Sequence, residues 1–211
     1  MTEDPPVVPA PDGRADRDTI EAALARAEGP LTFSGWALHG LDLSALDLSG
    51  CIFERCRGAG VDFSACDLSE ATFRNSDFNN AVFRRTKLAS THFSDCKLTG
   101  IQVSAASALG LVFVRCLLIA AQLRGLSFRR QDLDGLDFQD ADLSEADFRE
   151  AVLTNCSLRD AHVARARFEG ADLRGTDLGG LKLADAGRFR GATISKAQAA
   201  DLLAGLGLRV S

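Results

Sequence analysis

Several features that define large classes of proteins are missing from this sequence. No apolar run is long enough to span a membrane, and the first residues lack the basic start and apolar stretch of a secretory signal. We therefore expect a cytoplasmic protein that does not enter a membrane. The formal net charge of −5 gives no broad positive potential, so we expect no direct binding to nucleic acid.

The sequence also has little of what catalytic and metal sites need. It contains three widely separated histidines and six cysteines without a CxxC pair. It has neither a Walker loop nor a dinucleotide-binding fingerprint. We expect no enzyme activity, no catalytic residue, no metal ion and no cofactor.

What the sequence has instead is a repeat of five residues, visible in LDLSA LDLSG from Leu41. It runs from Leu31 to Asp185, which is 155 residues or 31 units of five without an insertion. The third residue is Leu, Phe or Val in every unit except those of Gly58 and Ala108. Because five matches neither the period of a helix nor that of a strand, the chain must turn once in each unit. The first and third residues then point inward, and the last two form a corner.

A second period of twenty residues places like side chains above one another. Four units make one coil, so we predict an all-β fold, a right-handed quadrilateral β-helix with short capping helices at both ends. Phenylalanines recur at this spacing in the third position, and their rings should stack in columns. The predicted structural core contains Phe33, Phe53, Phe73, Phe93, Phe113, Phe128, Phe148 and Phe168.

The N-terminal end departs from the repeat. Residues 1–15 are rich in proline and are expected to form a disordered tail. An N-terminal capping helix is predicted within residues 16–30, with Asp18 and Glu21 as a capping box. The β-helix then occupies residues 31–185.

At the C-terminal end, residues 186–211 are predicted to form a capping helix and a dimerisation tail. Ser195 with Gln198 reads as a capping box, and Gly205 is expected to end the helix. The residues that follow alternate like a short edge strand, which could pair across a dimer. The candidate dimer residues are Leu202, Leu203, Leu206, Leu208 and Val210.

All six cysteines occupy the first, inward position of their units. We expect buried, reduced thiols that act as small apolar fillers, because free cysteine is among the most buried residue types. Cys96 and Cys116 are neighbours in one column and are the only pair worth testing for oxidation.

Charge is segregated along the repeat. Residues 131–150 carry eight acids against Arg149 alone, whereas residues 74–130 carry nine basic residues against two aspartates. The eight acids form an acidic belt, which is the candidate partner-binding site: Asp132, Asp134, Asp137, Asp140, Asp142, Glu145, Asp147 and Glu150. The alternative for each aspartate at the second position is that it only stabilises the adjacent turn.

A second anomaly is apolar and surrounds the irregular Ala108 unit. Five apolar residues fall at nominally outward positions, where they could form a patch for a partner. A local register slip that turns some of them inward is the alternative. The residues of this candidate apolar patch are Leu109, Val112, Val114, Leu117 and Ile119.

The repeated units, including ADLSE ADFRE from Ala141, resemble the pentapeptide-repeat proteins over about three quarters of the chain. The end from Gly180 to Val210, GLKLADAGRFRGATISKAQAADLLAGLGLRV, resembles that of the quinolone-resistance group, which includes Qnr-type and mycobacterial fluoroquinolone-resistance proteins. This resemblance implies a non-enzymatic homodimer, joined at its C-terminal end, that imitates duplex DNA. Its implied partner is DNA gyrase or topoisomerase IV, which it would protect from poisons. The alternative is a generic scaffold with a different protein partner.

Overall fold

The computed structural model describes residues 5–13, 15–181, 186–205 and 207–208. The chain divides into two compact units, Met1–Cys116 and Leu117–Ser211. Each unit contains coils of the predicted four-sided β-helix.

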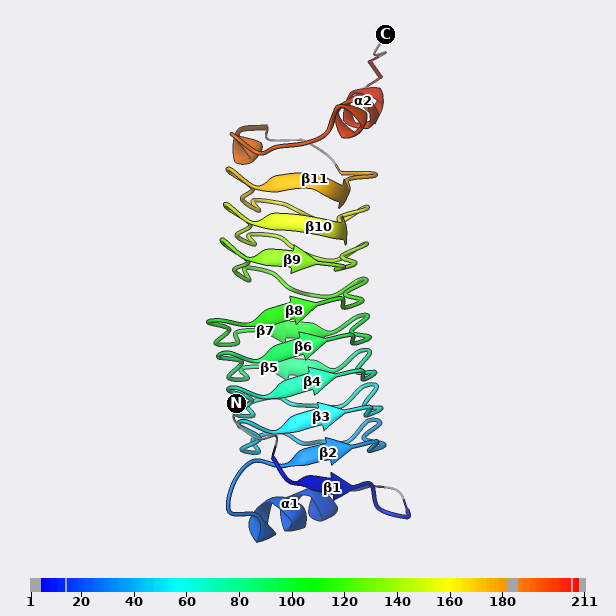
Figure 1. Cartoon of the computed structure of the whole chain (residues 1–211), viewed down its shortest axis with the longest axis vertical. Coiled ribbons are helices and arrows are strands. Elements are labelled where there is room, and N and C mark those ends of the chain that lie inside the picture. The colour runs from blue at the N-terminus through cyan, green and yellow to red at the C-terminus, as the bar shows by residue number, and fades with distance from the viewer. Residues whose placement is uncertain (1–4, 14, 182–185, 206, 209–211) are drawn as a thin grey trace. The chain divides into compact units, whose positions relative to one another are not determined.

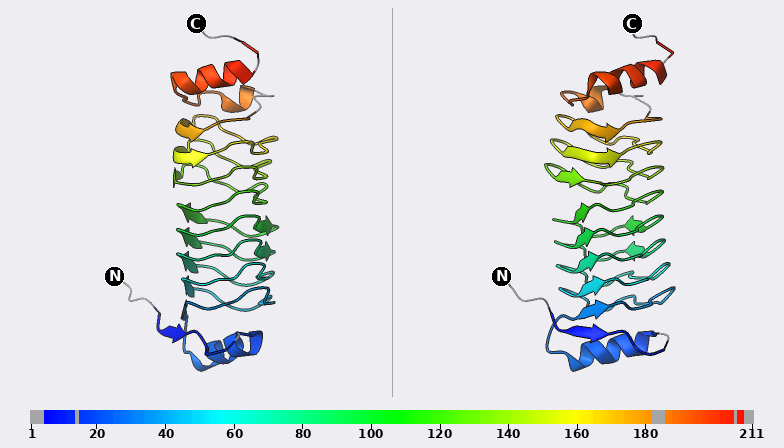
Figure 2. Two further views of the ribbon diagram at one scale, coloured as in Figure 1. Left: turned by 90° about the vertical axis from the view of Figure 1, so that its right-hand side faces the viewer. Right: turned by 45° about the vertical axis from the view of Figure 1, so that its right-hand side comes forward.

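In the first unit, short parallel strands repeat at intervals of twenty residues on one side of the coil. They form a sheet in the order β1-β2-β3-β4-β6-β8, and β5 and β7 pair on the opposite side (Figures 1 and 2). Isolated parallel bridges, such as Ala37 with Arg57 and Asp47 with Asp67, mark the other two sides. The elements are β1 (Val7–Pro9), α1 (Arg17–Arg26), β2 (Thr32–Ser34), β3 (Ile52–Glu54), β4 (Thr72–Arg74), β5 (Val82–Arg84), β6 (His92–Ser94), β7 (Gln102–Ser104) and β8 (Val112–Val114).

The corner of each five-residue unit is made by its fifth residue. Every fifth residue from Gly35 to Gly180 has a positive φ, with Gly175 as the exception among them. Ala45, for example, has φ 62° and Gly60 has φ 70°. Left-handed backbone favours glycine, which explains why glycine recurs at this position.

Phenylalanine columns fill the core, as the twenty-residue period predicts. All eight phenylalanines of the predicted core are at most 1% exposed. In the first unit the ring of Phe73 stacks between Phe53 at 4.8 Å and Phe93 at 4.6 Å. The second unit has its own column, in which Phe148 lies 4.7 Å from Phe128 and 4.9 Å from Phe168.

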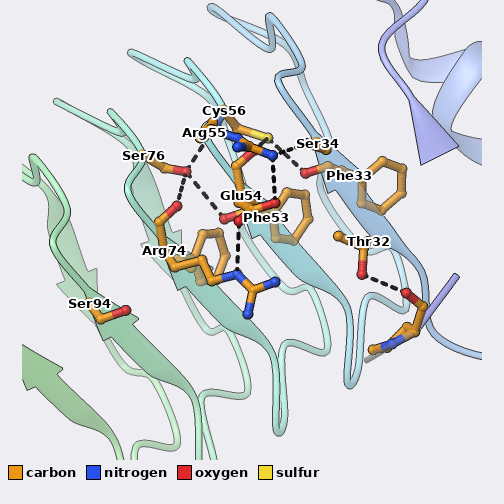
Figure 3. A network of polar contacts seen from close by, with 12 residues as sticks. Thr32, Phe33, Ser34, Phe53, Glu54, Arg55, Cys56, Arg74, Ser76 and Ser94 are labelled. Carbon is orange, nitrogen blue, oxygen red and sulfur yellow. Dashed lines mark hydrogen bonds and ion pairs between the residues drawn. The ribbon is translucent and has the colours of Figure 1, made fainter. Parts of the chain in front are cut away.

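The buried cysteines do more than fill space. The Sγ of Cys56 donates to the carbonyl oxygen of Phe33 at 3.2 Å, 23 residues earlier, and Ser76 donates to Phe53 in the same way (Figure 3). Burial raises the pKa of the Cys56 thiol to about 11. The expectation of buried, free thiols is confirmed, and Cys56 in addition links adjacent coils as a hydrogen-bond donor.

The N-terminal end also differs from the sequence-based expectation. The proline-rich segment contains β1, which pairs in parallel with β2, so residues 5–9 are not a disordered tail. Helix α1 begins after Asp16, whose Oδ1 accepts from the backbone N–H of Thr19 at 2.9 Å. The prediction of Asp18 as the N-cap is wrong.

The second unit contains a three-stranded parallel sheet and the C-terminal helix. Its elements are β9 (Asp132–Asp134), β10 (Val152–Ser157), β11 (Asp172–Asp177), the 3₁₀ helix η1 (Ala186–Phe189) and α2 (Lys196–Gly205). Near its end the coil offset changes from twenty residues to twenty-one, because the N–H of Phe168 donates to Arg188. Phe189, outside the regular repeat, stacks on Phe168 at 4.8 Å.

The predicted capping box of α2 is confirmed. Ser195 N–H donates to Gln198 Oε1 at 2.6 Å, and Gln198 N–H donates to Ser195 Oγ at 3.2 Å. Gln198 Nε2 also donates to the carbonyl oxygen of Leu173 at 2.6 Å, which attaches the helix to the last strand. Helix α2 ends at Gly205, as predicted, and Gly207, with φ 79°, makes a left-handed turn after it.

Gly58 stands at a third position, where every other unit except that of Ala108 has Leu, Phe or Val, and this exception has a steric cause. A Cβ at Gly58 would lie 2.4 Å from the Cε1 of Phe78, so the Phe78 ring occupies the space of the missing side chain. We expect Gly58→Leu to lower the free energy of unfolding by about 1–3 kcal/mol through overpacking. Urea unfolding measures this change.

A double variant provides the control for this prediction. Adding Phe78→Leu should recover about 1 kcal/mol or more of the loss, since the two side chains compete for one space. Adding Phe83→Leu instead should not, because Phe83 is not among the atoms nearest to the Gly58 position. Additive effects for Gly58 and Phe78 would contradict the packing argument.

Candidate functional site

The eight carboxylates of the acidic belt encircle one coil of the second unit. Asp132 and Asp134 belong to β9, whereas Asp140, Glu145 and Glu150 lie at corners with positive φ. All eight residues are exposed or half-buried. Because the coil has four sides, the eight side chains point in different directions, and a flat partner surface would meet only some of them.

Arginines neutralise part of the belt. Glu145 accepts from Arg124 at 2.8 Å and also pairs with Arg165, one coil on. These two arginines hold the pKa of the Glu145 carboxyl below its usual value. One corner of the belt is therefore a ladder of alternating charges that ties three coils together.

Two further belt residues also pair with arginines, Glu150 across adjacent coils and Asp147 within its own unit. Glu150 accepts from Arg129 at 3.0 Å and from Arg130 at 2.7 Å. Asp147 pairs with Arg149 at 2.6 Å. Three of the nine basic residues in residues 74–130, Arg124, Arg129 and Arg130, thus pair with the belt.

Three belt aspartates stabilise turns, as the alternative interpretation predicts. A carboxylate oxygen accepts from the backbone N–H two residues later: Asp137 from Gln139 at 3.0 Å, Asp142 from Ser144 at 2.9 Å and Asp147 from Arg149 at 3.1 Å. The same contact occurs outside the belt, at Asp62 and Ser64. These aspartates have a structural role that needs no partner.

Most of the unneutralised charge lies on two adjacent sides of the coil, formed by residues 131–140, and Asp142 on the next side also forms no ion pair with a described residue. Asp132, Asp134, Asp137 and Asp140 form no ion pair with any residue that the structure describes. Among the residues that the structure describes, Asp134 and Asp140 accept from side-chain amides, of Asn155 and Gln139 respectively, each at 3.2 Å.

Sequence reasoning missed one member of this surface. Asp160 is exposed and lies one coil beyond Asp140, whose N–H donates to the carbonyl oxygen of Arg159 at 3.1 Å. The run of acids in the sequence ends at Glu150 and therefore excludes Asp160. The twenty-residue offset between coils, applied to Asp140, identifies Asp160. We call Asp132, Asp134, Asp137, Asp140 and Asp160 the acidic face.

The candidate apolar patch keeps its outward register. Leu109 is 84% exposed and Leu117 is 41% exposed, while Val112, Val114 and Ile119 are half-buried. The register-slip alternative is therefore wrong. Leu109, Val112 and Val114 lie in the first unit, and Leu117 and Ile119 lie in the second.

The candidate dimer residues lie on and beyond α2. Leu202 is half-buried, Leu203 is 37% exposed and Leu208 is 56% exposed. Leu206 and Val210 lie outside the described residues, as does most of the predicted edge strand. Among the side chains of α2 that the structure describes, none is buried, so this helix presents apolar residues to its surroundings.

The described residues offer neither a cluster of metal ligands nor a membrane-spanning helix. No group of three or more histidine, cysteine, aspartate or glutamate side chains in residues 5–13, 15–181, 186–205 and 207–208 could hold a metal ion. In the same ranges, neither helix has the length and apolar character needed to cross a membrane.

Comparison with known proteins gives one family and one set of similar structures. The sequence matches a family model described as "Pentapeptide repeat region" over residues 46–123, and one described as "Pentapeptide repeats (8 copies)" over residues 112–149 and 151–186. No curated protein sequence shows a significant match.

The similar structures include two of QnrB1, which is described as a plasmid-mediated fluoroquinolone resistance protein. A trypsin-treated variant of QnrB1 has a TM-score of 0.66 and 21% identity, covering 98% of both chains. Full-length QnrB1 has a TM-score of 0.64 and 18% identity, covering 97% of this chain and 98% of its own. At these identities the likeness establishes the shared fold.

Proposed function

Because this chain belongs to the pentapeptide-repeat family, we propose that it is a non-enzymatic mimic of duplex DNA that binds a type II topoisomerase. Its partner is DNA gyrase or topoisomerase IV, which it modulates or protects from poisons such as fluoroquinolones. The observation that carries the proposal is the acidic face, whose five carboxylates have no cationic partner among the described residues.

The density of charge on the acidic face supports the proposal. Coils stacked like strands advance about 4.8 Å each, so two coils occupy about 10 Å of the axis. Five carboxylates in that length give one charge per roughly 2 Å, close to the value of about one per 1.7 Å for duplex DNA. A cleft that is basic enough to bind DNA would attract this surface for the same electrostatic reason.

The proposal has a direct test in a gyrase assay. Purified protein is expected to inhibit DNA supercoiling at micromolar concentrations, and to change the amount of drug-stabilised cleavage complex. Serum albumin at the same concentration serves as the control. A protein without effect on either reaction, with gyrase or with topoisomerase IV, would refute the proposal.

We further propose a homodimer formed through the C-terminal end. The exposed leucines of the α2 segment, Leu203 and Leu208, support it because apolar side chains on a helix without buried residues favour a second surface. Leu203→Glu is expected to convert the dimer to a monomer by placing a charge in the contact, as measured by light scattering.

A matched substitution controls for added charge on the helix. Ala197→Glu places the same charge on an exposed residue of α2, six positions away and on a different face. This variant should remain dimeric. A wild-type protein that is monomeric, or a Leu203→Glu variant that stays dimeric, would rule out this interface.

The exposed Leu109 favours a second candidate function, a generic scaffold for a different protein partner. A single apolar side chain that is 84% exposed supports a contact with another protein less strongly than a contiguous patch would. The acidic face therefore carries the leading proposal, and Leu109 provides the variant that separates the two.

A further inference from the structure

A separate segment of the chain covers the edge of the sheet at β2 in the N-terminal unit, and we call this edge the groove. The groove runs along β2, and β1 occupies it with Val7 opposite Thr32 and Pro9 opposite Ser34. Thr32 N–H donates to the carbonyl oxygen of Pro6 at 2.9 Å, and Thr32 Oγ1 donates to that of Pro5 at 2.8 Å, the contact drawn beside Thr32 in Figure 3. The coil thus holds β1 through donors aimed at its carbonyl oxygens.

The only tryptophan of the chain belongs to the same groove. Trp36 is 1% exposed, and its indole N–H donates to the carbonyl oxygen of Val8 at 3.0 Å. Thr32 is also 1% exposed. Both residues are buried with β1 in place, so departure of β1 would exchange these hydrogen bonds for bonds to water. An occupant strand is therefore favoured here, but the donors do not distinguish which molecule supplies that strand.

The attachment of β1 itself is weak in apolar contact. Val7 is 64% exposed and Pro9 is exposed. A hollow of about 580 Å³ lies beside the segment, lined by Pro5, Val8, Ala23 and Leu31 among others. Helix α1 therefore does not clamp β1 in place, and little buried apolar surface opposes its departure.

We propose that β1 exchanges between two copies of this chain, so that residues 5–9 of one copy fill the groove along β2 of another. A second copy supplies the same carbonyl oxygens in the same order. Its prolines keep the segment extended before it binds, which lowers the entropy lost on docking. The seven residues between Pro9 and Arg17 span at most about 23 Å, enough to reach an adjacent molecule. This inference does not depend on the topoisomerase or on the α2 dimer.

Hydrogen exchange of the unmodified chain tests whether β1 leaves its groove. The Thr32 amide is protected by Pro6, whereas the Thr72 amide, at the same position two coils on, donates to Cys51 inside the sheet. We expect Thr32 to exchange about tenfold faster than Thr72, or more. Equal exchange rates would overturn the proposal, because a strand that does not leave cannot exchange.

Cross-linking of two single variants tests the exchange itself. Pro9→Cys is mixed with Ser34→Cys and oxidised with glutathione disulfide, so that a disulfide between them forms only when the strand of one copy lies in the groove of the other. Both positions are accessible and opposite in register, whereas the six natural cysteines are buried. We expect a covalent heterodimer whose yield rises with protein concentration.

Two further experiments serve as the negative and the positive control for cross-linking. A mixture of Asp12→Cys with Ser34→Cys should give no heterodimer, because Asp12 is exposed but lies outside the paired register. The double variant with Pro9→Cys and Ser34→Cys in one chain should close an internal disulfide when dilute, which reports a folded groove. An internal disulfide in the double variant without any heterodimer from the single variants would overturn the proposal.

Discussion

Replacing Phe73 by alanine is expected to lower the free energy of unfolding by about 3–5 kcal/mol. The ring is fully buried and stacks on Phe53 and Phe93, and its edge meets Phe78 at 5.1 Å. Truncation removes these contacts and leaves a cavity between two coils that hydrogen bonds hold at a fixed spacing, so the site cannot collapse. Guanidinium unfolding followed by circular dichroism measures the loss.

The matched control is Phe73→Leu, which keeps most of the volume and should reduce stability by less than about 1.5 kcal/mol. A loss below about 1 kcal/mol for Phe73→Ala would mean that adjacent coils relax into the space, which would contradict a rigid spacing between them.

The double charge reversal Asp132→Lys with Asp140→Lys is expected to weaken topoisomerase binding by about a hundredfold or more. These two carboxylates belong to the acidic face, and neither accepts a turn-forming backbone N–H. The fold should tolerate lysine at the Asp140 corner, since Arg165 already occupies an equivalent corner with φ 59°. Surface plasmon resonance with immobilised gyrase measures the change.

The control for net charge is Asp12→Lys with Asp18→Lys, which alters two exposed acids of the first unit by the same amount. This variant should bind like the wild type. If both charge variants bind equally well and Leu109→Asp abolishes binding, the scaffold function replaces DNA mimicry.

The regular part of the fold could be predicted because it depends on short-range rules. One turn in five residues and four turns in a coil follow from spacing alone, and the stacked rings of Phe53 and Phe73 follow from both. The N-terminal strand could not be predicted, because its prolines read as disorder. Donors from Thr32 and Trp36, more than twenty residues away, decide its conformation.

The candidate site was only partly predictable for a related reason. The sequence locates the acids but not their neutralisation, since Arg124 and Arg165 reach Glu145 from the coils on either side. A twenty-residue offset brings such pairs together, but side-chain direction decides which of them form. The start of α1 could not be predicted from the sequence either. Asp16 and Asp18 are both followed by residues that suit a helix N-terminus, and only the backbone conformation shows that Asp16 is the N-cap.

The constant offset between coils also bears on how the gene can change. In the sheet from β2 to β8, each residue pairs with the residue twenty positions further along the chain. Loss or duplication of twenty codons would therefore again pair residues at equivalent positions of the coil. Without residues 71–90, for example, Phe93 would succeed Phe53 in the column and Cys96 would succeed Cys56. Such changes would alter the length of the coiled region while preserving its hydrogen-bond pattern. The twenty-one-residue step between Phe168 and Phe189 marks where this freedom ends.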